Sequence, residues 1–238
     1  MQSKKMIQEA IILAGGLGTR LRSVVSDLPK PMAPVAGRPF LEYLLEYWME
    51  QGVERFILSV SHLHQKISGH FGTEWRGCPI AYSVEAQPLG TGGAIVQALS
   101  LVHGTQVWVG NGDTFVDVDL AGMAKFHLGR SGCLTLATTR VISTARYSAL
   151  EIGEDQKIRG FVAKGQDAPG QINAGVYALE KNIFLLQAPP SERFSWEGDY
   201  LPALIKSGAP VLAFAAGDRF LDIGIPTDYA RAESFLHG

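Results

Sequence analysis

The chain has 238 residues, 46% of them hydrophobic, which suits one α/β domain with a sizeable core and is short for two full domains. Its formal net charge of −2 at pH 7 gives no general basic field of the kind that attracts nucleic acid or an anionic membrane surface. We therefore expect no nucleic-acid or membrane partner, and any phosphate ligand must be held by local groups.

The cysteines and the first apolar stretch bear on the cellular compartment. Two cysteines lie far apart without a Cys-x-x-Cys pair, so neither a disulfide framework nor a zinc site is predicted. The apolar stretch 10–13 is too short for a signal peptide or a membrane span. These features predict a cytoplasmic protein with a single domain over residues 1–238. A homo-oligomer is compatible with the sequence, which does not determine the number of subunits.

Strand-like and helix-like segments alternate through the first half of the chain. They predict strands over 10–13, 55–60, 80–84, 106–110 and 133–139, and helices over 40–51, 64–71, 91–100 and 120–130. Such alternation is typical of the α/β class, with a Rossmann-like, mostly parallel mixed sheet and helices on both faces. Short β-prone pieces follow at 149–152, 158–162 and 171–179, and later a helix over 226–236. We interpret the β-prone pieces as a small roof over the carboxyl edge of the sheet, where such sheets bind ligands.

A glycine-rich loop, Leu13-Ala14-Gly15-Gly16-Leu17-Gly18-Thr19-Arg20-Leu21, directly follows the first strand. Glycines there let backbone N–H groups approach a phosphate without a Cβ in the way. A dinucleotide fingerprint does not fit, because Leu21 stands where the third glycine counted from Gly16 is required, and a Walker loop lacks its Gly-Lys-Ser/Thr. A tight turn without a ligand explains two glycines but not three together with Arg20.

This loop, together with Lys30-Pro31-Met32, resembles the signature of the sugar-1-phosphate nucleotidyltransferases, which make NDP-sugars. The resemblance implies the nucleotide-diphospho-sugar transferase fold, with a loop that wraps the base and triphosphate. It also implies nucleotide-binding roles for Leu13, Gly15, Gly16, Gly18 and Thr19, and phosphate-binding catalytic roles for Arg20 and Lys30. Fixed cations at these positions would stabilise the charge that builds on the phosphoryl oxygens in the transition state.

A second glycine cluster runs from Glu85 to Gly93 and is similar to the second motif of the same family. The resemblance places Glu85 at the edge of the base, with Gly90 and Thr91 also binding the nucleotide. A carboxylate accepts from the N1–H and N2–H₂ of guanine as a matched pair, which uracil, thymine, adenine and cytosine do not offer. GTP is therefore the expected nucleotide. The alternative for Glu85 is an exposed acid at a strand end.

Two aspartates end predicted strands and are candidate ligands to Mg²⁺. Asp113 follows Asn111-Gly112 after the strand at 106–110, and Asp222 ends another apolar strand. Magnesium needs one or two carboxylates besides phosphate oxygens and waters, and the family uses these two aspartates in that way. The alternatives are a turn-forming Asn-Gly-Asp for Asp113 and a helix cap for Asp222. Asp119 more simply caps the helix that begins at 120.

The residues expected to bind the sugar phosphate, which we call the sugar side of the site, are assigned by resemblance. It implies that Asn111, Gly112, Tyr147, Lys164 and Asn173 bind the sugar phosphate. Two departures weaken this part of the pattern. The family commonly has Glu-Lys-Pro where this chain has Ala163-Lys164-Gly165, and Tyr-Gly where it has Tyr147-Ser148. Arg140 and Arg146 are candidates to supplement Lys164.

The expected reaction is in-line displacement at the α-phosphorus of GTP by a sugar 1-phosphate, without a covalent intermediate. No general base is required, because a sugar phosphate has a second pKa of about 6 and is largely dianionic at neutral pH. The segments 89–95, 111–115 and 222–229 resemble most the branch that makes GDP-D-glycero-α-D-manno-heptose. Ser148 and the polar loop 191–193 are candidates to recognise the extra hydroxyl of the heptose.

Other functions remain open at this point. A mannose-1-phosphate guanylyltransferase shares the chemistry, and an N-acetylmuramate-1-phosphate uridylyltransferase is disfavoured by Glu85. A catalytically silent NDP-sugar-binding regulatory subunit is expected to lose Arg20, Lys30, Asp113 or Asp222, and this chain keeps all four. An NAD-dependent dehydrogenase is disfavoured because its fingerprint is missing.

Overall fold

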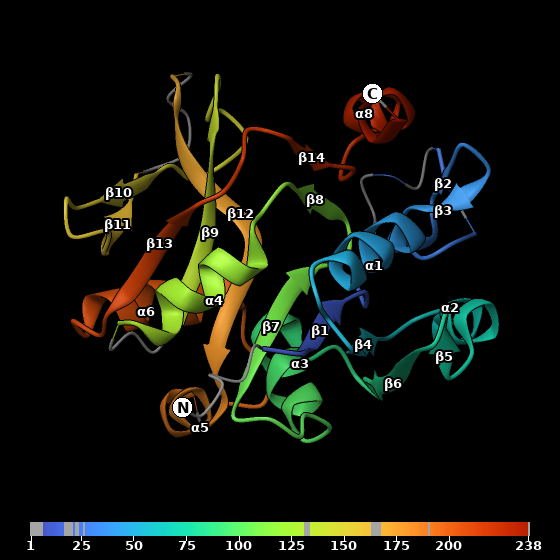
Figure 1. Cartoon of the computed structure of the whole chain (residues 1–238), viewed down its shortest axis with the longest axis horizontal. Coiled ribbons are helices and arrows are strands. Elements are labelled where there is room, and N and C mark those ends of the chain that lie inside the picture. The colour runs from blue at the N-terminus through green and yellow to red at the C-terminus, as the bar shows by residue number, and fades with distance from the viewer. Residues whose placement is uncertain are drawn as a thin grey trace.

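The computed structural model describes residues 7–16, 21, 24–25, 27–130, 134–162, 168–189 and 191–237. Within these residues a central eight-stranded sheet has the order β13-β9-β12-β7-β1-β4-β6-β5 (Figure 1). Its middle strands β7, β1, β4 and β6 are parallel, β12 is antiparallel to both neighbours, and β13 is parallel to β9. The strands are β1 (Glu9–Leu13), β4 (Arg55–Val60), β5 (Glu74–Trp75), β6 (Cys78–Val84), β7 (Gln106–Asn111), β9 (Leu134–Val141), β12 (Gly170–Glu180) and β13 (Val211–Ala215).

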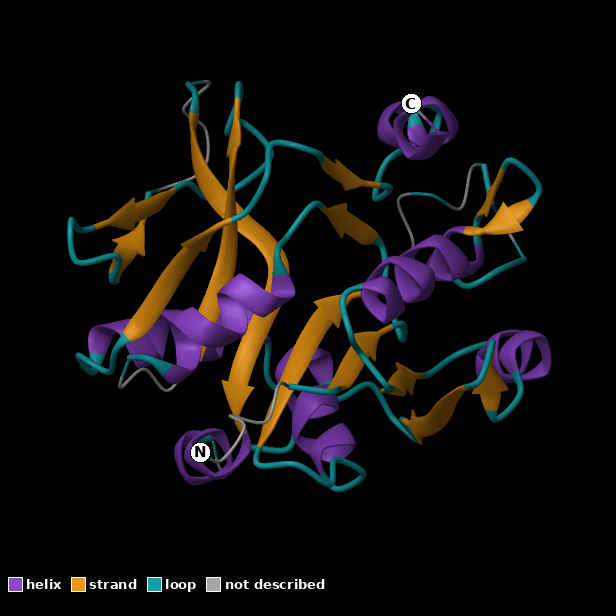
Figure 2. Cartoon of the chain, in the orientation of Figure 1, coloured by secondary structure: helices purple, strands orange, loops and turns teal. Residues whose placement is uncertain are grey.

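Helices cover both faces of this sheet (Figure 2). One core cluster holds the apolar faces of α1 (Phe40–Glu50), α2 (His64–Phe71), α4 (Leu120–Leu128) and α8 (Ala232–His237). The other core cluster holds α3 (Gly90–Leu99), α5 (Lys181–Gln187), the π-helical turn η2 (Trp196–Tyr200) and α6 (Leu201–Lys206). Adjacent strand residues such as Ile11 and Ile12 point into different clusters, because side chains alternate along a strand.

Outside the central sheet, the described residues form three small two-stranded sheets. They pair β2 (Pro34–Val35) with β3 (Arg38–Pro39), β8 (Thr114–Val116) with β14 (Phe220–Asp222), and β10 (Leu150–Ile152) with β11 (Ile158–Phe161). The remaining short elements are the 3₁₀ turn η1 (Lys30–Met32) and α7 (Pro226–Tyr229). The β8–β14 ribbon matters most for function, because it joins segments that lie far apart in the sequence.

The structure corrects two predicted elements. The piece at 171–179 is not part of a roof: it is β12, a strand of the central sheet between β9 and β7, whereas β10 and β11 do form a separate hairpin. The predicted helix over 226–236 is two short helices, α7 and α8. The backbone N–H of Arg231 bonds to the carbonyl of Asp228, three residues back, which interrupts the α-helical ladder there. No helix in the described part of the chain combines the length and apolarity that a membrane span requires.

Candidate functional site

A cavity of about 200 Å³ opens at the carboxyl ends of β1, β4 and β6, beside the first turn of α3. It brings together every predicted nucleotide-binding residue that the structure describes: Leu13, Gly15, Gly16, Glu85, Gly90 and Thr91. Four predicted site residues lie outside the described residues: Gly18, Thr19, Arg20 and Lys164. The two glycine motifs, about 70 residues apart, therefore form one cavity large enough for a base.

Glu85 lies against the first glycine motif. Its Oε2 accepts a hydrogen bond from the Leu89 backbone N–H at 2.9 Å. A Cβ placed on Gly15 would lie 2.8 Å from Glu85 Oε1, so the loop backbone passes close to this carboxylate. Burial raises the pKa of Glu85, and the Leu89 N–H opposes that rise in part. The carboxylate is thus held at the cavity wall with Oε1 beside Gly15.

The glycines of the second motif also have a packing role. Gly90 has φ +70°, and a Cβ there would lie 2.5 Å from the carbonyl oxygen of Phe194. A Cβ would come within 2.1 Å of the Phe194 ring at Gly92 and of the Glu192 carbonyl oxygen at Gly93. These glycines let the segment 192–194 cross the start of α3, which the sequence pattern alone did not indicate.

Asp113 and Asp222 meet at Lys30. In the β8–β14 ribbon Asp222 is opposite Thr114, and the Ile223 N–H donates to the Asp113 carbonyl at 3.0 Å. The Lys30 side chain is 9% exposed; its Nζ donates to Asp113 Oδ2 and lies 3.4 Å from Asp222 Oδ1. The structure therefore brings together the two predicted metal ligands and one predicted catalytic cation.

Arg146 extends this cluster toward the sugar side. One of its guanidinium nitrogens lies 3.8 Å from Asp222 Oδ2, and the other donates to Asp228, which also accepts from Arg231 at 2.6 Å. Arg140, the other arginine considered as a supplement to Lys164, is exposed on β9. Of the two, Arg146 is the one placed to meet a phosphate beside Asp222.

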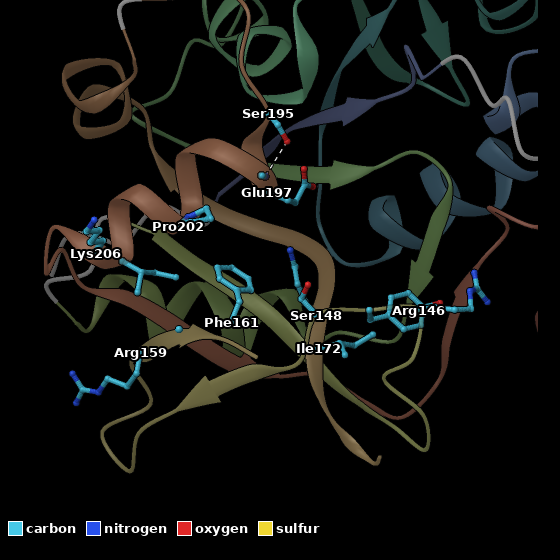
Figure 3. A pocket seen from close by; sticks show the side chains of 14 residues that line it. Arg146, Ser148, Arg159, Phe161, Ile172, Ser195, Glu197, Pro202 and Lys206 are labelled. Carbon is cyan, nitrogen blue, oxygen red and sulfur yellow. Dashed lines mark hydrogen bonds between the residues drawn. The ribbon is translucent and has the colours of Figure 1, made fainter. Parts of the chain in front are cut away.

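A second cavity, of about 890 Å³, lies between the η2–α6 segment and the β10–β11 hairpin (Figure 3). Tyr147 and Asn173, both predicted sugar-side residues, line it, and so does Ser148. Burial raises the pKa of Tyr147, whose ring packs edge-on against Phe220 at 5.7 Å. The loop 191–193 does not line this cavity, because its backbone turns toward α3, so Ser148 remains the candidate for the heptose hydroxyl.

Asn111 is the last residue of β7, and Gly112 follows it. The Gly112 N–H donates to the Leu13 carbonyl at 3.0 Å, and a Cβ on Gly112 would be 2.8 Å from that oxygen. Gly175, with φ +76°, packs against Asn111, whose Nδ2 would be 2.7 Å from a Cβ there. The pair therefore holds β7 against β1 and β12; whether it also contacts the sugar phosphate remains a prediction.

Comparison with known proteins places this arrangement in a family. The nucleotidyl transferase family model matches residues 9–238. The chain belongs to the nucleotidyl transferase family. Two relatives are D-glycero-alpha-D-manno-heptose 1-phosphate guanylyltransferases. That of Aneurinibacillus thermoaerophilus is 43% identical, covering 96% of this chain and 98% of the relative, and that of Campylobacter jejuni is 42% identical, covering 93% and 96%.

A solved structure resembles this nucleotidyltransferase along almost its whole length. HddC from Yersinia pseudotuberculosis is 38% identical, with a TM-score of 0.83 and coverage of 96% of this chain and 99% of that chain. HddC has also been solved in complex with GMP-PN. The family and the fold predicted from the two glycine motifs are confirmed.

Nucleotidyltransferases of this family generally use a divalent metal, and the Asp113–Asp222 pair fits one. Both carboxylates already converge on a single cationic group, the Lys30 ammonium. Among the described residues no cluster of three or more histidine, cysteine or acidic side chains is gathered for a metal. Two carboxylates are a donor set that suits a hard ion whose shell is completed by phosphate oxygens and water, and their role as metal ligands stays a prediction.

Two polar residues of the nucleotidyltransferase site were missed by the sequence reasoning. Ser59 on β4 is 1% exposed, lines the smaller cavity, and its hydroxyl is buried without a hydrogen-bond partner among the described residues. Glu197 lines the larger cavity. Ser59 could have been identified from the sequence, because it is a polar residue in the apolar run 55–60. Glu197 could not, because it lies in a polar stretch where an acidic residue is common.

Proposed function

We propose that this nucleotidyltransferase transfers GMP from GTP to D-glycero-α-D-manno-heptose 1-phosphate and releases pyrophosphate. The observation that carries the proposal is the similarity, along nearly the whole chain, to two guanylyltransferases named for that sugar phosphate. The geometry supports it, because the aspartates are linked to both cavities: Leu13 of the smaller cavity accepts from the N–H of Gly112, next to Asp113, and Arg146 of the larger cavity lies 3.8 Å from Asp222. We place the reaction in the cytoplasm, where GTP is made.

Glu85 gives the preference for guanine. Its Oε2 is engaged by the Leu89 N–H, which fixes the carboxylate while Oε1 stays beside Gly15 at the cavity wall. An ionised carboxylate accepts from both N1–H and N2–H₂ of guanine, whereas other bases present a ring acceptor or a single donor to it. Ser59 adds a buried hydroxyl that a polar atom of the base can pair with.

The phosphates are placed at the aspartate pair. Asp113 and Asp222 would hold Mg²⁺, which when bound neutralises charge on the phosphate oxygens. Lys30 contacts the same two carboxylates, and its ammonium would bind a phosphate oxygen that reaches them. Arg146, beside Asp222, orients the sugar phosphate. Fixed cations of this kind stabilise the developing charge of the departing pyrophosphate.

The attacking group needs no base from the protein. A sugar 1-phosphate is largely dianionic at pH 7, because its second pKa is about 6. The task of the site is therefore to align one sugar-phosphate oxygen with the α-phosphorus, opposite the leaving pyrophosphate. None of the described histidines lines either cavity, in keeping with this mechanism.

The test is pyrophosphate release over a grid of nucleotides and sugar 1-phosphates with Mg²⁺. GTP with the heptose 1-phosphate should give the highest kcat/KM. In a mixed assay the heptose 1-phosphate should outcompete mannose 1-phosphate by roughly 10- to 150-fold if the extra hydroxyl is hydrogen-bonded. Equal rates for the two sugars would contradict the sugar assignment, and equal use of UTP and GTP would contradict the nucleotide assignment.

A further inference from the structure

The larger cavity has a carboxylate in its lining besides the cationic side chains that suit a phosphate. Three cationic side chains line it, Arg146, Arg159 and Lys206, with Arg146 lying across the cavity from the other two (Figure 3). Glu197 is the one carboxylate among the described residues of its lining. A carboxylate repels a phosphate and only accepts hydrogen bonds. A ligand group that meets Glu197 must therefore donate a hydrogen bond, and the donors of a sugar phosphate are its hydroxyls.

Glu197 is held in place from two different elements. Its Oε2 accepts from the Thr91 hydroxyl of α3 at 3.1 Å, and its Oε1 accepts from the Tyr177 hydroxyl of β12 at 3.3 Å. An ionised carboxylate has about four acceptor sites, so each oxygen keeps capacity for a further donor. The carboxylate is fixed before any ligand arrives, with one free acceptor position on each oxygen.

Asn173, which the family resemblance assigned to sugar-phosphate binding, is largely occupied by protein contacts. Its Oδ1 accepts from the Gly175 N–H at 3.0 Å, and its Nδ2 donates to the Tyr177 hydroxyl at 2.7 Å. Tyr177 is fully buried, and burial raises its pKa well above the usual value, so it remains a donor. Asn173, Tyr177 and Glu197 thus form a directed chain of hydrogen bonds that ends at the carboxylate.

We propose that Glu197 is a specificity-determining residue that accepts hydrogen bonds from two neighbouring hydroxyls of the sugar, one on each carboxylate oxygen. Tyr177, Asn173 and Thr91 are positioning residues that aim it. The inference rests on the proposed function, in which the larger cavity holds the sugar 1-phosphate.

The first experiment is steady-state kinetics of Glu197→Gln with the sugar 1-phosphate that the wild-type enzyme turns over fastest. Glutamine keeps the size of the side chain but replaces one acceptor oxygen with a donor. The KM for the sugar 1-phosphate should rise roughly 10- to 100-fold, the loss expected for hydrogen bonds to a charged acceptor, with the KM for GTP within about twofold. Glu154→Gln, an exposed acid in the β10–β11 turn, is the matched control and should behave as wild type.

The second experiment uses sugar 1-phosphates that lack one hydroxyl. The wild-type enzyme should lose affinity for the analogue that lacks a recognised hydroxyl, whereas Glu197→Gln should lose much less between the same two sugars. If Glu197→Gln does not fold, Tyr177→Phe serves instead and should raise the same KM about 3- to 10-fold with kcat less affected. A KM within about twofold of wild type in a folded variant, or an unchanged penalty for every deoxy sugar, overturns the inference while leaving the proposed function standing. A wild-type enzyme that turns over no sugar 1-phosphate overturns the proposed function itself.

Discussion

Lys30 is expected to act as the counter-ion of the aspartate pair while no metal is bound. Replacing it with methionine keeps most of its apolar stem but removes the ammonium that Asp113 and Asp222 share, and leaves Asp222 with the Arg146 guanidinium at 3.8 Å. Breaking a buried ion pair costs about 3–5 kcal/mol. The two aspartate side chains are 34% and 18% exposed, so water screens them, and we expect about 1–2 kcal/mol.

A loss of that size should lower the Tm of Lys30→Met by roughly 2–8 °C in EDTA. Added MgCl₂ should raise the Tm of the variant more than that of the wild type, because the divalent ion no longer competes with an ammonium for the same carboxylates. Thermal melting followed by circular dichroism measures both effects. Lys66→Met is the control, since Lys66 is an exposed lysine of α2 that donates to the Asp27 carbonyl. A variant with the wild-type Tm in EDTA, or with the wild-type response to Mg²⁺, would refute the reasoning.

The remaining predictions concern the metal pair, the base and the packing of α3. Asp113→Asn and Asp222→Asn should each cut pyrophosphate release severely with the fold intact; a loss within about threefold, under roughly 1 kcal/mol, is too small for a metal ligand. Glu85→Gln should weaken the preference for GTP over UTP by about 1–3 kcal/mol, read from the ratio of kcat/KM values. Because burial raises the pKa of Glu85 above 4.5, GTP affinity should fall as the pH is lowered, starting at a higher pH than for an exposed glutamate; Glu85→Gln should abolish this dependence. Gly93→Ala should lower the free energy of unfolding by about 1–3 kcal/mol, measured by urea denaturation, because its Cβ would lie 2.1 Å from a carbonyl oxygen of the crossing segment.

The helices and strands of the parallel part of the sheet were predictable, because the apolar pattern of each segment is local in the sequence. The helix predicted over 64–71 coincides with α2, and the strand over 55–60 with β4. The place of β12 was not predictable in the same way. Its apolar pattern indicates a strand, but its position between β9 and β7 depends on pairing with segments distant in sequence. The break between α7 and α8 lies where the Arg231 N–H bonds to the Asp228 carbonyl, and the Asp228 side chain is paired with Arg146, which is far outside the predicted helix.

The candidate site was predictable where a motif carries it. Gly15, Glu85 and Asp113 lie at strand ends, and the carboxyl ends of parallel strands meet at one edge of the sheet. Glu197 has no such signal, because its role depends on Thr91 and Tyr177, which only the folded chain brings to it. The predicted nucleotide-binding residues that the structure describes therefore share one cavity, and their role stays a prediction, whereas the sugar-phosphate residues predicted from the sequence did not include Glu197.

The meeting of Lys30, Asp113 and Asp222 has a consequence for how the protein folds. The lysine is 83 and 192 residues away from its two partners along the chain. Closing loops of that length costs conformational entropy that local contacts do not offset, so contacts of this kind form late in folding. The nucleotide cavity, built mainly from neighbouring βα units, can form earlier. Stabilisation of this cluster by a metal ion should therefore be seen only in the completely folded chain. A partly folded chain should lack the grouping of Lys30, Asp113 and Asp222 that the reaction needs.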